Sequence, residues 1–329
     1  MAAILTACTS VDDRVARPPG SDAPSLGVGR SGGGVVRLYT SVTQATVDAV
    51  VSGFRAQAAG TEVEVFRAPT GELAARIAAE QREGGLRADV LWLTDPLSME
   101  EYDSQGLLAA WQPTEAEGIP AEYRSERYWG TRLLNMVIVA AADAEPLPAD
   151  WSDLAEPAYQ GTVAIPDPAF AGSAFGALGY LAQADGYGFD LYRALRANGA
   201  VQVQAPDEVV TGVAEGRYEA GMTLDFSVRT ALSNGSPVQL IWPSSGAIAI
   251  YSPIAVVAAE RDRSAAQAFT GFTLSAAGQG LIAGTGWQPT RSGVSGGPEP
   301  AGDQVSPDWA AAAGERDELI AEYQAIFDE

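Results

Sequence analysis

The segment 165–175 combines residue types that bind anions. A short run with β propensity, residues 161–165, ends at two prolines that cannot continue a strand ladder. Small residues follow, and an apolar repeat from Phe175 predicts a helix that begins near Ser173. The first turn of a helix has unpaired N–H groups and a partial positive charge, so this helix start is a candidate anion site. The alternative is an ordinary helix cap made by Ser173.

Polar residues also follow the other predicted strands. From residue 35 onward strands alternate with helices, which predicts parallel, doubly wound sheets. Ligands of such sheets lie beyond the carboxyl ends of the strands. The residues expected at these ends, and in the cleft that they would line, are Ser41, Thr43, Thr70, Gly71, Asp95, Arg132, Ser173, Ala174, Asp225, Phe226 and Tyr251.

These residues suit a small anion or zwitterion. Hydroxyls and helix-start amides suit a phosphate, phosphonate or carboxylate, which Arg132 would bind in a bidentate manner. Asp95 or Asp225 would take an amine, and Phe226 and Tyr251 would wall an apolar middle. Each residue also has a structural alternative. The arginine would pair with a surface carboxylate, the aspartates and Thr70 would cap helices, and Phe226 would be core.

Composition excludes several classes of function. The chain has 329 residues, 47% of them hydrophobic, which is enough for two globular lobes. Its net charge of -22 would repel nucleic acid. The chain contains no histidine and one cysteine, Cys8. It therefore lacks the commonest general base, any cysteine-cluster metal site and any intramolecular disulfide, and we expect no cofactor.

The first residues predict a membrane anchor. Leu5-Thr6-Ala7-Cys8 resembles the lipobox of bacterial lipoproteins, in which the cysteine is lipidated. A basic segment and most of the apolar segment of a signal peptide are missing before it. Residues 9–34 are rich in Gly, Pro, Ser, Asp and Arg, and this composition is typical of a flexible tether.

Two long apolar runs separate the predicted α/β blocks. They are expected as strands over residues 133–141 and 247–258. Two tandem helices are expected over 264–284, then a Gly/Pro/Ser loop over 292–307 and a terminal helix over 316–327. A serine in that loop fits the letters of a nucleophile elbow (293–297). No strand precedes it and no histidine could activate it, so we reject it.

This order of segments resembles the extracellular solute-binding proteins of ABC importers, in the group that includes ferric-ion, thiamine and 2-aminoethylphosphonate binders. The residues that carry the resemblance are Arg87-Ala88-Asp89-Val90-Leu91-Trp92, Gly106-Leu107-Leu108, Trp129-Gly130-Thr131-Arg132, the run 153–161, Ile165-Pro166-Asp167-Pro168 with Gly172-Ser173, and Ala276-Ala277-Gly278-Gln279-Gly280. Ferric binders of the group have adjacent tyrosines where this chain has Asp225-Phe226-Ser227. An iron or chelated-metal site is therefore only an alternative.

The resemblance implies an α/β, two-lobed periplasmic-binding-protein-like fold of type II. Each lobe would be a doubly wound sheet, and two crossover strands would join the lobes. Lobe 1 would comprise residues 35–136 plus 255–329, and lobe 2 residues 137–254, after a lipobox remnant and flexible tether over 1–34.

The resemblance also implies a function without catalysis. The protein would be a monomer on the outer face of the cell membrane, held by a lipid on Cys8. It would capture a small anionic or zwitterionic solute, such as 2-aminoethylphosphonate, and deliver it to an ABC permease. A surface hydrolase with paired carboxylates and a lobe that binds a partner protein are further alternatives.

Overall fold

The computed structural model describes residues 34–258 and 263–328, so the predicted lipidation site Cys8 and most of the tether lie outside the described residues. The strands are β1 (Val35–Thr40), β2 (Glu62–Arg67), β3 (Val90–Trp92), β4 (Tyr128–Ala141), β5 (Val163–Pro166), β6 (Val201–Val203), β7 (Ala220–Leu224), β8 (Val238–Ile241), β9 (Ala247–Val256), β10 (Gln288–Pro289) and β11 (Gln304–Val305). The α-helices are α1 (Gln44–Gln57), α2 (Thr70–Arg82), α3 (Pro96–Ser104), α4 (Gly172–Leu181), α5 (Gly188–Ala197), α6 (Pro206–Ala214), α7 (Asp225–Ser233), α8 (Ser264–Leu274), α9 (Ala276–Gly284), α10 (Trp309–Gly314) and α11 (Arg316–Asp328). Short 3-10 turns are η1 (Thr114–Gly118), η2 (Ala121–Tyr123), η3 (Trp151–Ala155) and η4 (Pro157–Tyr159).

The described strands form one sheet with the order β2-β1-β3-β9-β4-β7-β5-β6. β2, β1 and β3 are parallel to one another, and so are β7, β5 and β6. Between these two groups, β9 pairs antiparallel with β3, β4 with β9, and β7 with β4. The prediction of two α/β blocks is therefore confirmed, with the correction that antiparallel pairs join them into a mixed sheet.

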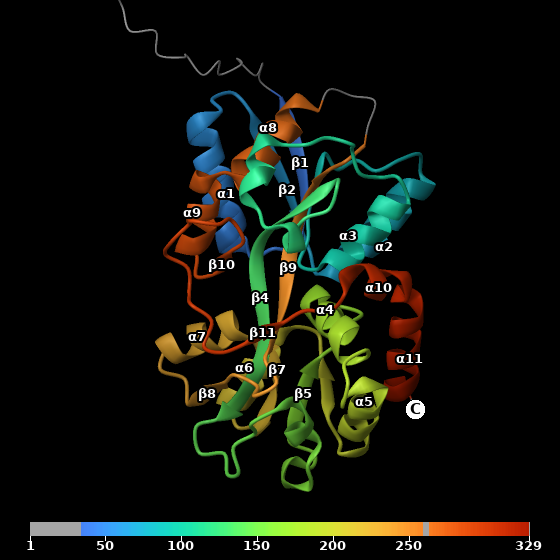
Figure 1. The fold of residues 1–329 in the computed structure, drawn as a ribbon, viewed down its shortest axis with the longest axis vertical. Helices are drawn as coiled ribbons and strands as arrows, with labels where there is room; N and C mark the ends of the chain where they lie inside the picture. The colour runs from blue at the N-terminus through green and yellow to red at the C-terminus, as the bar shows by residue number, and fades with distance from the viewer. Residues whose placement is uncertain (1–33, 259–262, 329) are drawn as a thin grey trace, which may run out of the picture. The chain divides into compact units, whose positions relative to one another are not determined.

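The two long strands β4 and β9 are the predicted crossovers. They run side by side through both groups of strands (Figure 1) and are buried almost throughout. A strand that is covered on both faces has a continuous apolar run, which explains the sequence pattern. β4 begins at Tyr128, earlier than the predicted Leu133, because the segment before Leu133 pairs with Pro253 and Ile254 of β9.

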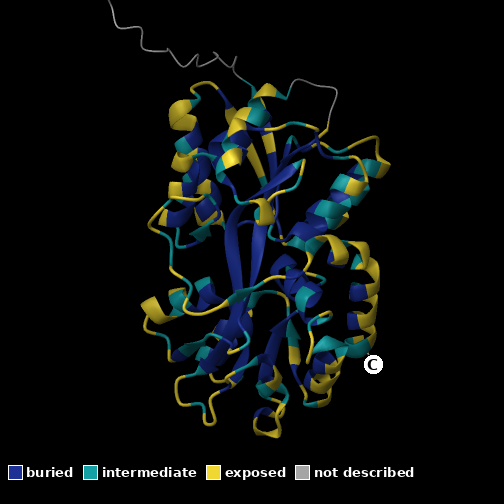
Figure 2. Cartoon of the chain, viewed as in Figure 1, coloured by how far each residue is buried: buried dark blue, intermediate teal, exposed yellow. Residues whose placement is uncertain are grey.

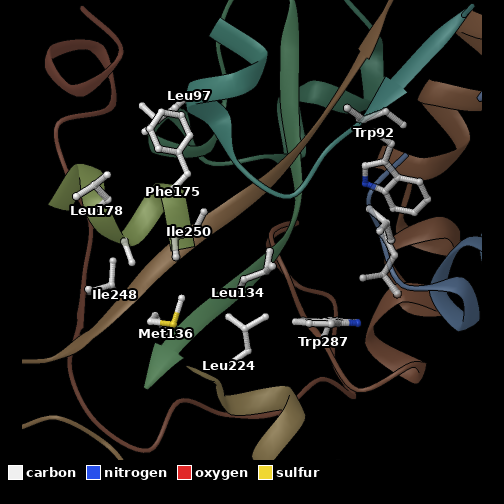
Figure 3. Packing of buried hydrophobic residues seen from close by; sticks show 14 of the residues in the cluster. Trp92, Leu97, Leu134, Met136, Phe175, Leu178, Leu224, Ile248, Ile250 and Trp287 are labelled. Carbon is white, nitrogen blue, oxygen red and sulfur yellow. The ribbon is translucent and has the colours of Figure 1, made fainter. Parts of the chain in front are cut away.

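The main hydrophobic core follows these crossover strands. Figure 2 shows buried residues concentrated along the sheet and exposed residues on the outer helices. Leu134 and Met136 of β4 belong to the same cluster as Ile248 and Ile250 of β9, and Figure 3 shows them together. Phe175 of α4 packs in this cluster beside Leu97 of α3, so the core is continuous between helices of the two blocks.

The C-terminal segment departs from the predicted lobe assignment. α8 and α9 pack on α1, as expected for residues of the first lobe. α11 instead packs on α5, where the Tyr323 and Tyr192 rings meet edge to face with centroids 5.1 Å apart. Gln202 of β6 also donates a hydrogen bond to the Tyr323 hydroxyl at 3.0 Å. Residues 255–329 therefore do not all pack with the first block, and the lobe boundaries stay a prediction.

Two local expectations also need correction. Asp225, expected at a strand end, is already the first residue of α7. The loop over 292–307 contains β11, which pairs parallel with the start of β9. In the part of the chain that the structure describes, we find no helix with the length and apolarity needed to span a membrane.

Candidate ligand-binding cleft

A cleft of about 280 Å³ lies where the two blocks of the sheet face each other. It is bordered by residues that follow β1, β2 and β3, and by the starts of α4, α6 and α7. The lining residues are Ser41, Thr43, Arg67, Ala68, Pro69, Thr70, Glu72, Thr94, Arg132, Leu134, Phe170, Ala171, Gly172, Ser173, Gln204, Ala205, Pro206, Asp207, Glu208, Leu224, Phe226, Ser227 and Trp287. The cavity thus lies beyond the carboxyl ends of these strands, where the general rule for ligands of parallel sheets (the strand-end rule) predicts a cleft.

Five helices, α1, α2, α4, α6 and α7, begin at this cleft. None of them has a side-chain hydrogen bond at its N-cap. By contrast, α3 begins beside the cleft and is capped by Asp95. Several helix N-termini with unpaired N–H groups that face one space create a positive local potential, and this favours an anion.

Three hydroxyl groups meet at one end of the cleft. The Thr94 Oγ1 atom lies 3.2 Å from Ser41 Oγ and 3.1 Å from Thr70 Oγ1, so the three side chains form a chain of hydrogen bonds. The start of α4 packs tightly against them at Gly172. A Cβ atom there would lie 2.6 Å from Thr94 Oγ1 and 2.8 Å from Thr70 Oγ1. Glycine at this position therefore lets the first turn of α4 approach the hydroxyl cluster.

Arg132 is a buried cation that makes no ion pair with the described residues. Its exposed fraction is 1%, and among the described residues its Nε and Nη1 atoms have no hydrogen-bond partner. Its guanidinium lies over the Trp287 ring, 4.0 Å from the centroid. Burial, together with the nearby charge of Arg67, lowers the pKa of Arg132 to about 9, so the side chain is still charged at neutral pH. A buried charge is costly unless an opposite charge compensates it.

An aromatic and aliphatic wall stands beside Arg132. The rings of Phe226 and Trp287 stack with centroids 4.1 Å apart and planes 12° apart. Figure 3 shows Leu134 and Leu224 beside the Trp287 ring, and all four residues line the cleft. The cleft therefore combines an apolar wall with polar groups that come together from several helix starts, as is typical of small-molecule sites.

Six of the predicted ligand-binding residues line the cleft: Ser41, Thr43, Thr70, Arg132, Ser173 and Phe226. Ser173 is the second residue of α4, whose N-cap is Ala171, so Ser173 lies in the first turn and does not cap the helix. Gly71 is not in the lining. A Cβ atom at Gly71 would lie 2.4 Å from the Ala169 carbonyl oxygen, so this glycine permits a close backbone approach.

The other four predicted residues do not line the cleft. Asp95 is fully buried and accepts hydrogen bonds from the Ser98 N–H at 2.7 Å and from the Ser98 hydroxyl at 3.1 Å. Asp225 pairs with Arg229 at 3.1 Å, although burial raises its pKa. Ala174 is buried within the first turn of α4, and the Tyr251 ring meets the Trp309 ring edge to face at 5.6 Å. These residues have structural partners instead.

Several lining residues were not predicted. Gln204, Asp207 and Glu208 directly follow β6, so the strand-end rule contains a signal for them. Arg67 is the last residue of β2 and could have been found in the same way. Trp287 has no such local signal, because it comes from the turn before β10 and reaches the cleft only through tertiary packing.

The described residues offer no obvious metal centre. Within 34–258 and 263–328, no group of three or more histidine, cysteine, aspartate or glutamate side chains could hold a metal ion. The two aspartates considered from the sequence are occupied, Asp95 by Ser98 and Asp225 by Arg229. The cleft lining holds two arginines, Arg67 and Arg132, and three carboxylates, Glu72, Asp207 and Glu208, which do not form such a group.

Comparison with known proteins places the fold in context. AfuA from Actinobacillus pleuropneumoniae, solved with fructose-6-phosphate bound, superposes with a TM-score of 0.81 at 19% identity, over 89% of this chain and 98% of that one. Iron-bound HitA from Pseudomonas aeruginosa superposes with a TM-score of 0.77 at 22% identity, over 89% of this chain and 99% of that one. The chain thus has the two-lobed, type II fold of periplasmic binding proteins, as predicted.

Sequence comparison agrees with the fold. A probable ABC transporter periplasmic-binding protein of Sinorhizobium fredii is 26% identical over 235 residues, which cover 68% of this chain and 65% of the relative. An uncharacterised protein of Haemophilus influenzae is 28% identical over 176 residues, 52% of this chain and 49% of the relative. The match thus spans less than two thirds of the length of each of these relatives. A family model matches residues 36–288, and the chain belongs to the bacterial extracellular solute-binding proteins.

Proposed function

We propose that this protein is the substrate-binding component of an ABC importer and captures a small organic anion that carries a phosphate or phosphonate group. The observation that carries the proposal is Arg132, a buried guanidinium with unpartnered nitrogens in the wall of the cleft. An anionic ligand would supply the missing opposite charge, and a tetrahedral oxyanion offers several acceptors to a planar donor. 2-Aminoethylphosphonate is the favoured example of this class.

The helix starts support the same class of ligand. The first turns of α1 and α4 border the cleft and have no acidic residue and no side-chain cap. Ser41, Thr70 and Ser173 add hydroxyl donors at the same place. An oxyanion can accept hydrogen bonds from amides and hydroxyls together, whereas an apolar or purely cationic solute offers no acceptor to the first-turn amides.

The alternatives have less support. A ferric or chelated-metal cargo would need several anionic ligands close together, and no group of three or more such side chains meets among the described residues. A hydrolase with Asp95 and Asp225 as its carboxylate pair would need both groups free, and each already has a partner in the fold. We therefore infer that the solute is bound and released unchanged and passed to the permease, with the protein acting as a monomer outside the cytoplasm. The lipid on Cys8 remains part of this proposal.

Isothermal titration calorimetry tests the proposal. The ligands are 2-aminoethylphosphonate, ethylphosphonate, inorganic phosphate, fructose 6-phosphate and ferric citrate, each titrated into native protein and into Arg132→Gln. The control is Arg196→Gln, because Arg196 is exposed on α5 and does not line the cleft. We expect a phosphonate or phosphate ester to bind, and Arg132→Gln to weaken it by at least about tenfold, the range for a lost charged hydrogen bond.

A second variant tests the position of the anion. Ser173→Asp places a negative charge in the first turn of α4, where the oxyanion would lie, and should abolish binding. Binding of ferric citrate alone would contradict the proposal. Unchanged affinity in both Arg132→Gln and Ser173→Asp would show that the anion site lies elsewhere.

A further inference from the structure

The five helix starts at the cleft differ in their charge. The first turns of α1 and α4 contain no acidic residue. The first turn of α6 contains Asp207 and Glu208, both exposed and both in the cleft lining. The cleft is therefore electrically asymmetric, because the positive ends of α1 and α4 are left open while the start of α6 is covered by carboxylates.

The carboxylates of α6 are not neutralised by the arginines of the same cleft. Asp207 accepts a hydrogen bond from the Ser227 hydroxyl, and the carboxylate of Glu208 has no hydrogen bond or ion pair among the described residues. No ion pair within this part of the chain joins Asp207 or Glu208 to Arg67 or Arg132. Charges of both signs thus line one small cavity and stay apart.

The surroundings of α6 suit an ammonium group. Phe226 and Ser227 of α7 line the cleft next to Asp207, since Ser227 is the hydrogen-bond donor to Asp207. Phe226 thus brings an aromatic ring into the same cavity as the two carboxylates, and both kinds of group are favourable partners for a cation. The buried and unpartnered guanidinium of Arg132 in the same cavity supplies the second, independent sign of a ligand, and it requires that the ligand also carry an anion.

We propose that Asp207 and Glu208 form a cation subsite that selects zwitterionic ligands, with the ammonium group at the start of α6 and the oxyanion at Arg132 and the start of α4. This inference rests on the proposed function and adds the residues that determine specificity. It moves the amine-binding role from Asp95 and Asp225, which the fold occupies, to two carboxylates that are exposed in the cleft.

Helix stabilisation is the competing explanation for these acids. Acidic residues in a first turn stabilise a helix through its dipole, without any ligand. Asp190 is such a residue, since it lies in the first turn of α5 and does not line the cleft. Glu72 in the first turn of α2 does line the cleft but does not belong to the proposed subsite. Asp190 therefore provides a matched control outside the cleft, and Glu72 tests whether any carboxylate of the lining has the same effect.

The test compares two ligands that differ by one ammonium group, 2-aminoethylphosphonate and ethylphosphonate. Calorimetry gives the ratio of their affinities for native protein, Asp207→Asn, Glu208→Gln, the double variant, Asp190→Asn and Glu72→Gln. We expect native protein to prefer the amino ligand by about tenfold or more, and the double variant to bring the ratio close to one. Circular dichroism and melting temperature check the fold, and Glu208→Gln alone is informative because its carboxylate has no partner to lose.

The outcomes separate the two proposals. Equal affinity of native protein for both ligands overturns the cation subsite and leaves the anion site standing. The subsite is also overturned if the double variant keeps the native preference for 2-aminoethylphosphonate over ethylphosphonate. The same holds if Glu72→Gln or Asp190→Asn reduces that preference as much as the double variant does. Binding of neither phosphonate, together with binding of another solute class, overturns the proposed function itself.

Discussion

Asp95 gives a prediction that needs no ligand. Its carboxylate is completely buried, at the N-cap of α3, and accepts two hydrogen bonds from Ser98. Burial raises the pKa of Asp95 to about 6, although the bonds from Ser98 lower it in part. The substitution Asp95→Asn keeps the shape and an oxygen acceptor for the helix cap, and it removes the ionisation.

The sign and size of the effect follow from linkage between protonation and folding. Because the pKa of Asp95 is higher in the folded protein than the ordinary 3.8, the folded state binds the proton more tightly. The stabilisation that the protonated Asp95 side chain gives to the folded state is fully present below about pH 4 and is lost as the pH rises through about 6. The gap between the two pKa values corresponds to roughly 3 kcal/mol. Asp95→Asn should therefore be more stable than native protein by up to about 3 kcal/mol near pH 7.5.

Urea unfolding at several pH values between about 4 and 7.5 measures this difference. The stability difference between Asp95→Asn and native protein should shrink below about 1 kcal/mol near pH 4, because the pH is then close to the unfolded-state pKa and the folded state holds its proton almost completely. Asp150→Asn is a control with the opposite sign. Burial alone would raise the pKa of Asp150, but hydrogen bonds from Ser244 and Ser245 and other donors hold it below the usual range. That variant should lose stability near neutral pH. A difference for Asp95→Asn that is flat with pH, or opposite in sign, would refute the reasoning.

The remaining predictions also concern packing that the sequence does not reveal. Gly172→Ala should lower the free energy of unfolding by about 1–3 kcal/mol, because the new Cβ atom would lie 2.3 Å from a carboxylate oxygen of buried Asp95. Gly280→Ala is the control, because this helical glycine has open space around it, and the change should be neutral or stabilising. Equal effects of the two substitutions on urea unfolding would contradict this reasoning. Trp287→Ala should cost about 3–5 kcal/mol in urea unfolding, since the ring is 2% exposed and carries the stacked aromatic wall of the cleft; a loss below about 1 kcal/mol would argue against that packing. Tyr323→Ala should lower the free energy of unfolding, measured with urea, by a similar amount, because the Tyr323 ring packs α11 against Tyr192 of α5. Glu322→Gln removes only an exposed ion pair with Arg193 and should change that free energy by less than about 1 kcal/mol.

Much of the fold was predictable because its signals are local. The helix start at Gly172 follows two prolines and a run of small residues, and the apolar runs of β4 and β9 indicated strands buried on both faces. The position of the cleft followed from the strand-end rule, which needs only the order of strands and helices. These features depend on hydrogen bonding and side-chain periodicity within about a dozen residues.

The site was only partly predictable because it depends on pairings between distant segments. The sequence predicts Asp225 at a strand end in the cleft, but Asp225 is the first residue of α7 and its carboxylate is buried and paired with Arg229 of the same helix. Arg229 in turn donates a hydrogen bond to the carbonyl of Gly286, a residue far along the chain. Tyr251 lies on a crossover strand, where one step along the strand changes the face of the sheet. Its ring points away from the cleft toward Trp309.

The amino-acid sequence by itself determined the class of the molecule: two α/β blocks, two buried crossover strands and a set of helix starts able to hold an anion. Only the tertiary structure decided which of these groups share one cavity. The register of β4 against β9 and the turn before β10 bring Arg132 over the Trp287 ring. They leave its Nε and Nη1 atoms without a hydrogen-bond partner in the part of the chain that the structure describes. The physical reason is that a local sequence sets the conformation of an element, whereas the distance between two side chains far apart in the chain is set by the packing of the elements that carry them.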